Sequence, residues 1–148
     1  ASAAAGFLMA VVWFDLMFDV QVRGRGAVSA DALSSISRYY RRVTTDAAPM
    51  SRLVATAMLV LLVSLAVEIA DARRPAWIVW ASLAVAGSAI GLAAARTVRS
   101  AVRLGLDNDP IEVRARIART VYRDHVYCFA AMTVVAALQV AAAFGGVR

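Results

Sequence analysis

The 148-residue chain has no lysine, one cysteine, one histidine and three prolines. A single cysteine, Cys128, excludes an internal disulfide and any Cys-x-x-Cys redox or metal motif. A single histidine, His125, leaves no zinc signature and no second axial histidine for haem. The sequence also lacks a P-loop, a dinucleotide-binding fingerprint and a usable Ser-His-Asp order. We therefore predict no metal and no cofactor.

All 16 basic residues are arginine, and the formal net charge is +6. No alternation of aromatic and basic residues accompanies this charge, so we predict no nucleic-acid partner. Arginine gathers in the cytoplasmic loops of membrane proteins, and we interpret the excess in that way. The first apolar block lacks a basic leader, so we expect no cleavable signal peptide.

Apolar residues make up 61% of the chain, and the mean hydropathy is +0.68. An ordinary soluble domain is about 45–50% apolar. The excess falls in four blocks, each long enough to cross a hydrocarbon core of about 30 Å. We predict an all-α integral membrane four-helix bundle, with residues 1–148 forming a single transmembrane domain. The expected spans are residues 2–22, 49–70, 76–95 and 126–144.

The segment between the first two spans contains an amphipathic pattern over residues 29–43. Apolar side chains recur there at helical spacing, at Leu33, Ile36, Tyr40 and Val43. One interpretation is a helix lying in the membrane interface, with Tyr39 and Tyr40 at headgroup level. The alternative is a packing helix that covers the end of the bundle.

The third and fourth helices are predicted to continue beyond the membrane. Arginines concentrate in these extensions and in the first loop, whereas the second loop is short and carries only Arg73 and Arg74. The positive-inside rule then predicts a multi-pass protein of the plasma (inner) membrane, with cytoplasmic Arg-rich loops and both termini outside. We expect the following arginines to contact lipid headgroups or a docking partner: Arg38, Arg41, Arg42, Arg96, Arg99, Arg103, Arg116 and Arg119.

The third span contains a Gly-x-x-x-Gly motif at Gly87 and Gly91. Small residues at this spacing allow two membrane helices to approach closely, within one chain or between protomers. The motif does not distinguish between these two arrangements.

Two acidic residues, Asp15 and Asp19, lie one helical turn apart near the end of the first span. A carboxylate near the centre of a membrane helix costs roughly 2.5–3.5 kcal/mol on insertion scales, so such residues are functional candidates by default. The fourth span begins at the same membrane level with Asp124 and His125. We expect these four side chains to meet at the cytoplasmic mouth of the bundle.

Three interpretations of this polar group remain open. It can brace the helices, it can form a metal site of two aspartates and a histidine, or it can be the polar end of a ligand pocket. The residues of such a pocket would be Trp13, Asp15, Asp19, Asp124 and His125. Candidates for acid–base catalysis are Asp15, Asp19 and His125.

The layout resembles that of the anthrone-oxygenase-like small four-helix membrane proteins. The shared features are an aromatic-rich first span, the amphipathic segment Leu33 to Val43, the basic extension Arg96 to Arg103 and a histidine, His125, where the fourth span begins. The resemblance covers most of the chain at the level of topology. It implies possible cofactor-free oxygenation of an aromatic substrate.

The leading functional prediction is a small polytopic membrane protein that binds a hydrophobic ligand or lipid, or docks as an accessory subunit on a larger membrane complex. Its partners would be membrane lipids and either such a complex or further copies of itself; we expect no nucleic acid among them. One alternative is a small oxygenase-like membrane enzyme acting on a lipid-soluble substrate. The other is an oligomeric ion or proton pathway lined by Asp15 and Asp19.

Overall fold

The computed structural model describes residues 1–24, 26–71 and 74–145. These residues form helices and connecting loops, with no strand among them. Four helical segments are long and apolar enough to cross a membrane, as predicted from the sequence. They comprise Ser2–Val22, Pro49–Asp71, Ala76–Leu106 and Ile111–Phe144. The chain is therefore a multi-pass membrane protein.

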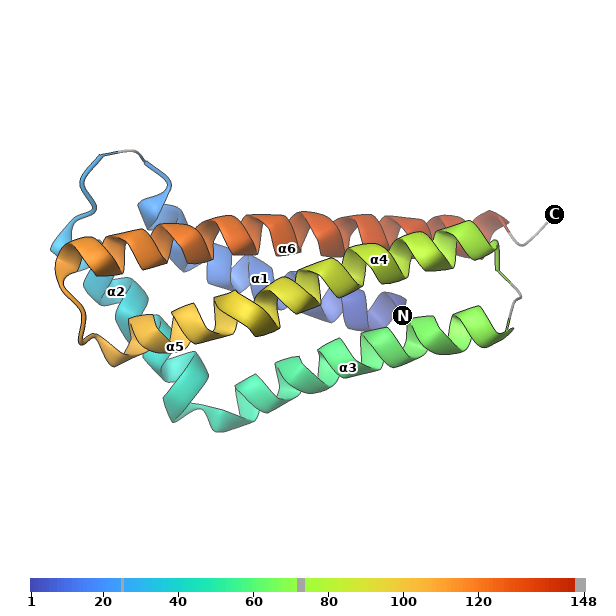
Figure 1. Ribbon diagram of the computed structural model, residues 1–148, viewed down its shortest axis with the longest axis horizontal. Helices are drawn as coiled ribbons and strands as arrows, with labels where there is room; N and C mark the ends of the chain where they lie inside the picture. The colour runs from blue at the N-terminus through green and yellow to red at the C-terminus, as the bar shows by residue number, and fades with distance from the viewer. Residues whose placement is uncertain (25, 72–73, 146–148) are drawn as a thin grey trace.

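The first and last helices pack along each other. Helix α1 covers Ser2–Asp19 and ends in a short 3₁₀ segment, η1, at Val20–Val22. Helix α6 covers Ile111–Gly145 and runs the whole length of the molecule (Figure 1). This pair has the most extensive contact of any two helices. The buried polar side chains of α1 therefore have α6 as a neighbour.

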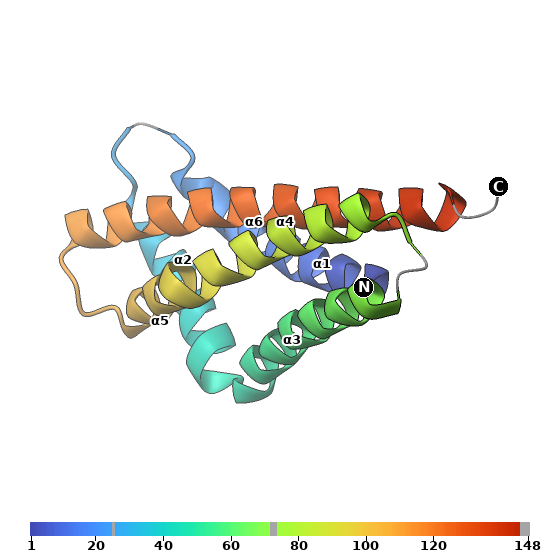
Figure 2. The same cartoon turned by 45° about the vertical axis from the view of Figure 1, so that its right-hand side comes forward.

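The two middle spans form a helical hairpin. Helix α3 covers Ala48–Asp71 and α4 covers Ala76–Leu92. The chain continues from α4 through a five-residue π-helical segment, η3 (Ala93–Thr97), into α5 (Val98–Leu106). In Figures 1 and 2, α3 slants away from α6 between the α3–α4 turn and its N-terminal end. The continuous path of α4, η3 and α5 agrees with the predicted extension of the third helix.

Helix α2 (Ala30–Arg41) crosses the end of the bundle at a steep angle to α5 and α6 (Figure 1). Ser29 caps it, accepting a hydrogen bond from the Ala32 amide at 3.2 Å, and a π-helical segment, η2 (Arg42–Asp46), leads on to α3. Its apolar side chains Leu33 and Ile36 are 1% and 0% exposed. This burial favours the packing-helix interpretation of the segment.

The buried apolar residues form two separate cores. One lies among α1, α3, α4 and α6 and includes Leu61, Leu65 and Val135. The other lies at the Arg-rich end, where α2, α5 and α6 meet, and includes Leu33 and Val121. Three buried polar residues lie where the chain passes from one core to the other. Asp19 precedes Val22 of the second core, and Asp124 and His125 lie between Val121 of the second core and Cys128 of the first.

Gly105 explains how closely α5 approaches α2. A Cβ atom at this position would lie 2.8 Å from the Arg41 amide nitrogen and 2.9 Å from its Cα. Gly105 is therefore the position in α5 at which the backbone of α2 approaches most closely. The residue with left-handed backbone is Asp107, at φ 57°.

Candidate functional site

The polar side chains of α1 converge with α2 and α6 in one buried group, which we call the Asp–His–Tyr cluster. It consists of Asp15, Asp19, Tyr39, Tyr40 and His125. Asp15 and Asp19 share one face of α1 because they are separated by four residues. Asp19 is only 1% exposed, so its carboxylate needs partners within the protein.

The two tyrosines of α2 supply one donor to each carboxylate. The Tyr39 hydroxyl donates to Asp15 Oδ1 at 2.6 Å, and the Tyr40 hydroxyl donates to Asp19 Oδ1 at 2.7 Å. Tyr40 is 2% exposed, and the Tyr39 ring stacks on Phe18 at a centroid distance of 4.0 Å. Tyr40 therefore points into the protein, and the headgroup-level depth of the two tyrosines stays a prediction.

His125 lies between the two carboxylates. Its Nδ1 is 2.7 Å from Asp19 Oδ2, and its Nε2 is 3.7 Å from Asp15 Oδ2. Asp19 can only accept when ionised, so Nδ1 must carry the proton of the shorter contact. Protonation of Nε2 as well would let one imidazolium face both negative charges.

Burial and the neighbouring carboxylates act on the two phenols in the same direction. Burial, followed by the Asp15 carboxylate, raises the pKa of Tyr39. Burial, followed by the Asp19 carboxylate, raises the pKa of Tyr40 well above its usual value. Both phenols therefore stay protonated at neutral pH and act as hydrogen-bond donors.

Asp124 is buried beside His125 but belongs to a different set of contacts. Its Oδ2 accepts from Arg96 Nε at 3.0 Å and from the Thr97 hydroxyl at 3.0 Å, and its Oδ1 forms an ion pair with Arg96. Both partners lie in η3, and π-helical segments often occur at functional positions. The expectation that Asp124 would join Asp15 and Asp19 is thus correct for its burial beside His125, but its hydrogen bonds go to other residues.

Several other predicted site residues lie away from the cluster. Trp13 is 55% exposed, and its ring lies 5.7 Å from that of Phe129, so it does not line the cluster. A Cβ atom added at Gly87 or Gly91 would meet nothing within 4 Å. These glycines therefore make no close helix contact within the described part of the chain.

The predicted docking arginines divide into two groups. Arg96 and Arg103 form ion pairs, with Asp124 and Asp109 respectively. The Arg103 guanidinium makes two hydrogen bonds of 2.7 Å and lowers the pKa of Asp109. Of the other six, Arg119 is half-buried. The remaining five are exposed, namely Arg38, Arg41, Arg42, Arg99 and Arg116.

The cluster can hold a proton between two carboxylates. Most of its hydrogen-bonding groups, however, already bond to one another. Among the described residues, no group of three His, Cys, Asp or Glu side chains is placed to hold a metal ion. The sequence pointed to Asp15, Asp19 and His125 but missed the tyrosines as their partners. The only available signal was that Tyr40 continues the apolar stripe of Leu33 and Ile36, which indicates burial.

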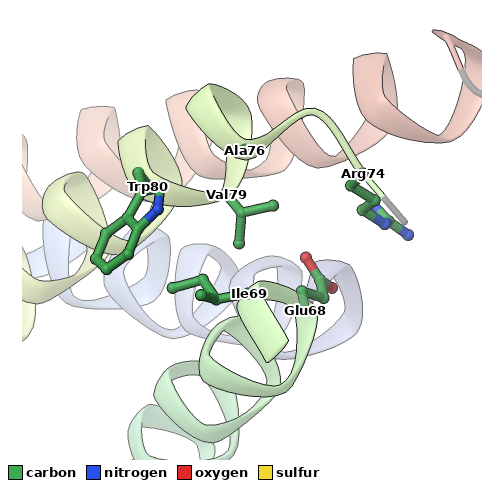
Figure 3. Close-up of a pocket in the computed structure, with 6 residues that line it drawn as sticks. All are labelled: Glu68, Ile69, Arg74, Ala76, Val79 and Trp80. Carbon is green, nitrogen blue, oxygen red and sulfur yellow. The ribbon is translucent and has the colours of Figure 1, made fainter. Parts of the chain in front are cut away.

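A small cavity of about 90 Å³ lies at the other end of the molecule, next to the α3–α4 turn. Figure 3 shows Glu68 and Arg74 on one side of it and Trp80 on the other, with Ile69 and Val79 between them. Arg74 donates to Gln139 Oε1 at 3.0 Å. None of the lining residues belongs to the Asp–His–Tyr cluster.

Comparisons with protein families, with curated proteins and with solved structures find no match to this chain. The chain is a small polytopic membrane protein by its four candidate spans. The resemblance to anthrone-oxygenase-like proteins stays a prediction.

Proposed function

We propose that this protein binds anionic phospholipid through its Arg-rich end, which is formed by α2, α5 and the first half of α6. The observation that carries the proposal is an imbalance of charge. Most carboxylates at this end already have partners, whereas many arginines do not.

The paired carboxylates are those closest to the helix packing. Asp15 and Asp19 belong to the Asp–His–Tyr cluster, and Asp124, Asp107 and Asp109 pair with Arg96, Arg114 and Arg103. Among the described residues of α2, η2, α5 and α6, six exposed arginines form no ion pair. They are Arg38, Arg41, Arg42, Arg99, Arg116 and Arg123. They outnumber the exposed carboxylates of these elements, which are Asp31, Asp46 and Glu112.

Such a surface fits the lipid chemistry expected next to it. The positive-inside rule places an Arg-rich end at the cytoplasmic leaflet, whose anionic lipids attract basic residues by about 1 kcal/mol for each arginine near the surface. A guanidinium group also matches the geometry of a phosphate, because it can donate two parallel hydrogen bonds.

The Asp–His–Tyr cluster supports this function by holding α2 in place. Tyr39 and Tyr40 attach α2 to α1, and Tyr40 also lies 3.4 Å from His125 Nδ1 on α6. Arg38 and Arg41, which flank these tyrosines in α2, are thereby held beside α5. The cluster is a brace in this proposal.

The proposal is tested by measuring which lipids remain bound to the protein. The protein is released from bilayers of equal phosphatidylglycerol and phosphatidylcholine content, and retained lipids are counted by native mass spectrometry. We expect a severalfold preference for phosphatidylglycerol that falls as the salt concentration rises, since exposed charges are screened. Equal retention of the two lipids would contradict the proposal.

A second candidate function is a membrane enzyme, favoured by the contact of both His125 ring nitrogens with carboxylates. A histidine held in this way is a typical general acid or base. The family resemblance implies oxygenation of an aromatic substrate such as an anthrone. This activity is measured as oxygen uptake. Turnover that Asp15→Asn abolishes without lowering thermal stability would support the enzyme, and no uptake with anthrone would contradict it.

A further inference from the structure

A hollow of about 320 Å³ lies on the part of α6 that belongs to the Arg-rich end. Its lining consists of Glu112, Arg116, Arg119, Thr120 and Arg123. Glu112, Arg116, Arg119 and Arg123 are separated by three or four residues, so their side chains share one face of α6, and Thr120 is adjacent to Arg119. Three guanidinium groups and one carboxylate leave the lining with an excess of two positive charges.

One of the three arginines is already held in position. Arg119 Nη2 donates to the Gly26 carbonyl oxygen, which ties α6 to the loop before α2. The Arg119 Nε is buried and has no hydrogen-bond partner. Because this nitrogen is buried, Arg119 contributes to the hollow through its positive charge and not through Nε.

The other two arginines are free to turn toward a ligand. Arg116 and Arg123 are exposed and form no ion pair among the described residues. The Thr120 hydroxyl donates to the Arg116 carbonyl oxygen at 3.1 Å, so the guanidinium groups supply the donors to a ligand. Arginine is well suited to this because its planar donors bind phosphate oxygens in pairs.

The hollow lies next to the apolar surface of the same helix. Val126 and Tyr127 are 44% and 45% exposed, and Val126 follows Arg123 by three residues, or about 4.5 Å along the axis. The headgroup layer on each side of a bilayer is only several ångströms thick. If the hydrocarbon core begins near Val126, Arg123 lies at the depth of the lipid phosphates. A phosphate bound there would be close to acyl chains.

We infer that this hollow is a binding site for the phosphate group of one anionic phospholipid, whose acyl chains run along α6 beyond Val126. The inference rests on the proposed function, because it assigns the bound lipid to one place on the Arg-rich end. A soluble phosphate compound has the same charged group but gains nothing from the adjacent apolar surface.

The test compares two double variants that remove the same charge. Arg116→Gln with Arg123→Gln empties the hollow of its free guanidinium groups and spares Arg119, which holds the Gly26 loop. Arg41→Gln with Arg42→Gln removes two exposed arginines of the same end that do not line the hollow. Binding of short-chain phosphatidylglycerol to the detergent-solubilised full chain is measured by calorimetry, with phosphatidylcholine and inorganic phosphate as further probes.

We expect the hollow variant to weaken phosphatidylglycerol binding at least tenfold and the control variant to weaken it less than threefold. Equal losses in the two variants would overturn the single site but leave lipid binding by the whole Arg-rich end standing. An unmodified protein that binds phosphatidylglycerol no better than phosphatidylcholine would overturn both proposals. Displacement of phosphatidylglycerol by inorganic phosphate at equal concentration would overturn the assignment to a lipid, and would identify a site for soluble phosphate.

Discussion

At the scale of the residue, the Tyr40 hydroxyl connects three helices within the polar cluster. It donates to Asp19 Oδ1 and lies 3.4 Å from His125 Nδ1. These contacts join α2 to both α1 and α6. Because Asp19 and His125 are buried as well, the loss of this hydroxyl cannot be compensated readily by water.

We predict that Tyr40→Phe destabilises the protein by about 1.5–3 kcal/mol, the usual range for a hydrogen bond to a charged group. The aromatic ring and its packing are retained, so the loss reports on the hydroxyl. The free energy of unfolding is measured by titrating mixed micelles with a denaturing detergent.

Tyr127→Phe is the matched control. The Tyr127 hydroxyl is 2.7 Å from Ser88 Oγ at an exposed position, and neither group is charged. We expect a loss below about 1 kcal/mol. Similar losses for the two variants would show that burial and charge add nothing to the Tyr40 bond.

At the scale of the element, the contact between α2 and α5 depends on the absence of a side chain at Gly105. Gly105 is buried in α5 and faces the backbone of Tyr40 and Arg41. Backbone atoms cannot turn aside as the end of a flexible side chain can. The position of α2, and hence of its two tyrosines, therefore depends on this glycine.

Gly105→Ala should destabilise the protein by about 1–3 kcal/mol, because the added Cβ would force the two helices apart. The thermal unfolding midpoint, measured by circular dichroism in detergent, should fall. Since the tyrosines would move with α2, the variant should also be cleaved faster by protease in the loop before α2.

Gly87→Ala provides the comparison within the same continuous helix path. A Cβ there meets nothing within 4 Å, and alanine is favoured over glycine in a helix by up to about 1 kcal/mol. We expect an unchanged or slightly higher midpoint. A fall as large as that of Gly105→Ala would contradict the assigned role of Gly105.

At the scale of the whole molecule, the two ends of the bundle differ in charge. The α3–α4 turn lies at one end, and α2, the α5–α6 turn and most of the arginines lie at the other (Figure 1). The proposed lipid binding requires the Arg-rich end to face the anionic leaflet. The orientation of the protein in the membrane is thus the property on which both proposals depend.

Cysteine labelling tests this orientation. In a Cys128→Ala background, Asn108→Cys places a thiol in the α5–α6 turn and Ala76→Cys places one at the start of α4, both at exposed positions. A membrane-impermeant maleimide should label Ala76→Cys in intact cells and Asn108→Cys only after permeabilisation. The reverse pattern would place the Arg-rich end outside. The unaltered protein should stay unlabelled, since Cys128 is 6% exposed.

The sequence by itself determined the class of protein. Four apolar blocks of sufficient length predict four spans, because the bilayer thickness sets how many residues a helix needs to cross it. The helical periodicity of Leu33 and Ile36 likewise predicted the apolar face of α2, although not whether lipid or protein covers it. These features are local in sequence, so they can be recognised without knowing which helices touch.

Only the tertiary structure decided the partners of the polar groups. The common membrane level of the first and fourth spans predicted that Asp19 and His125 would meet, but nothing in the sequence indicated the hydrogen bond from Tyr40 to Asp19. The π-helical turn that brings Arg96 and Thr97 to Asp124 was also not apparent from the sequence. Partner choice depends on how the helices rotate and cross, which packing of the complete chain determines.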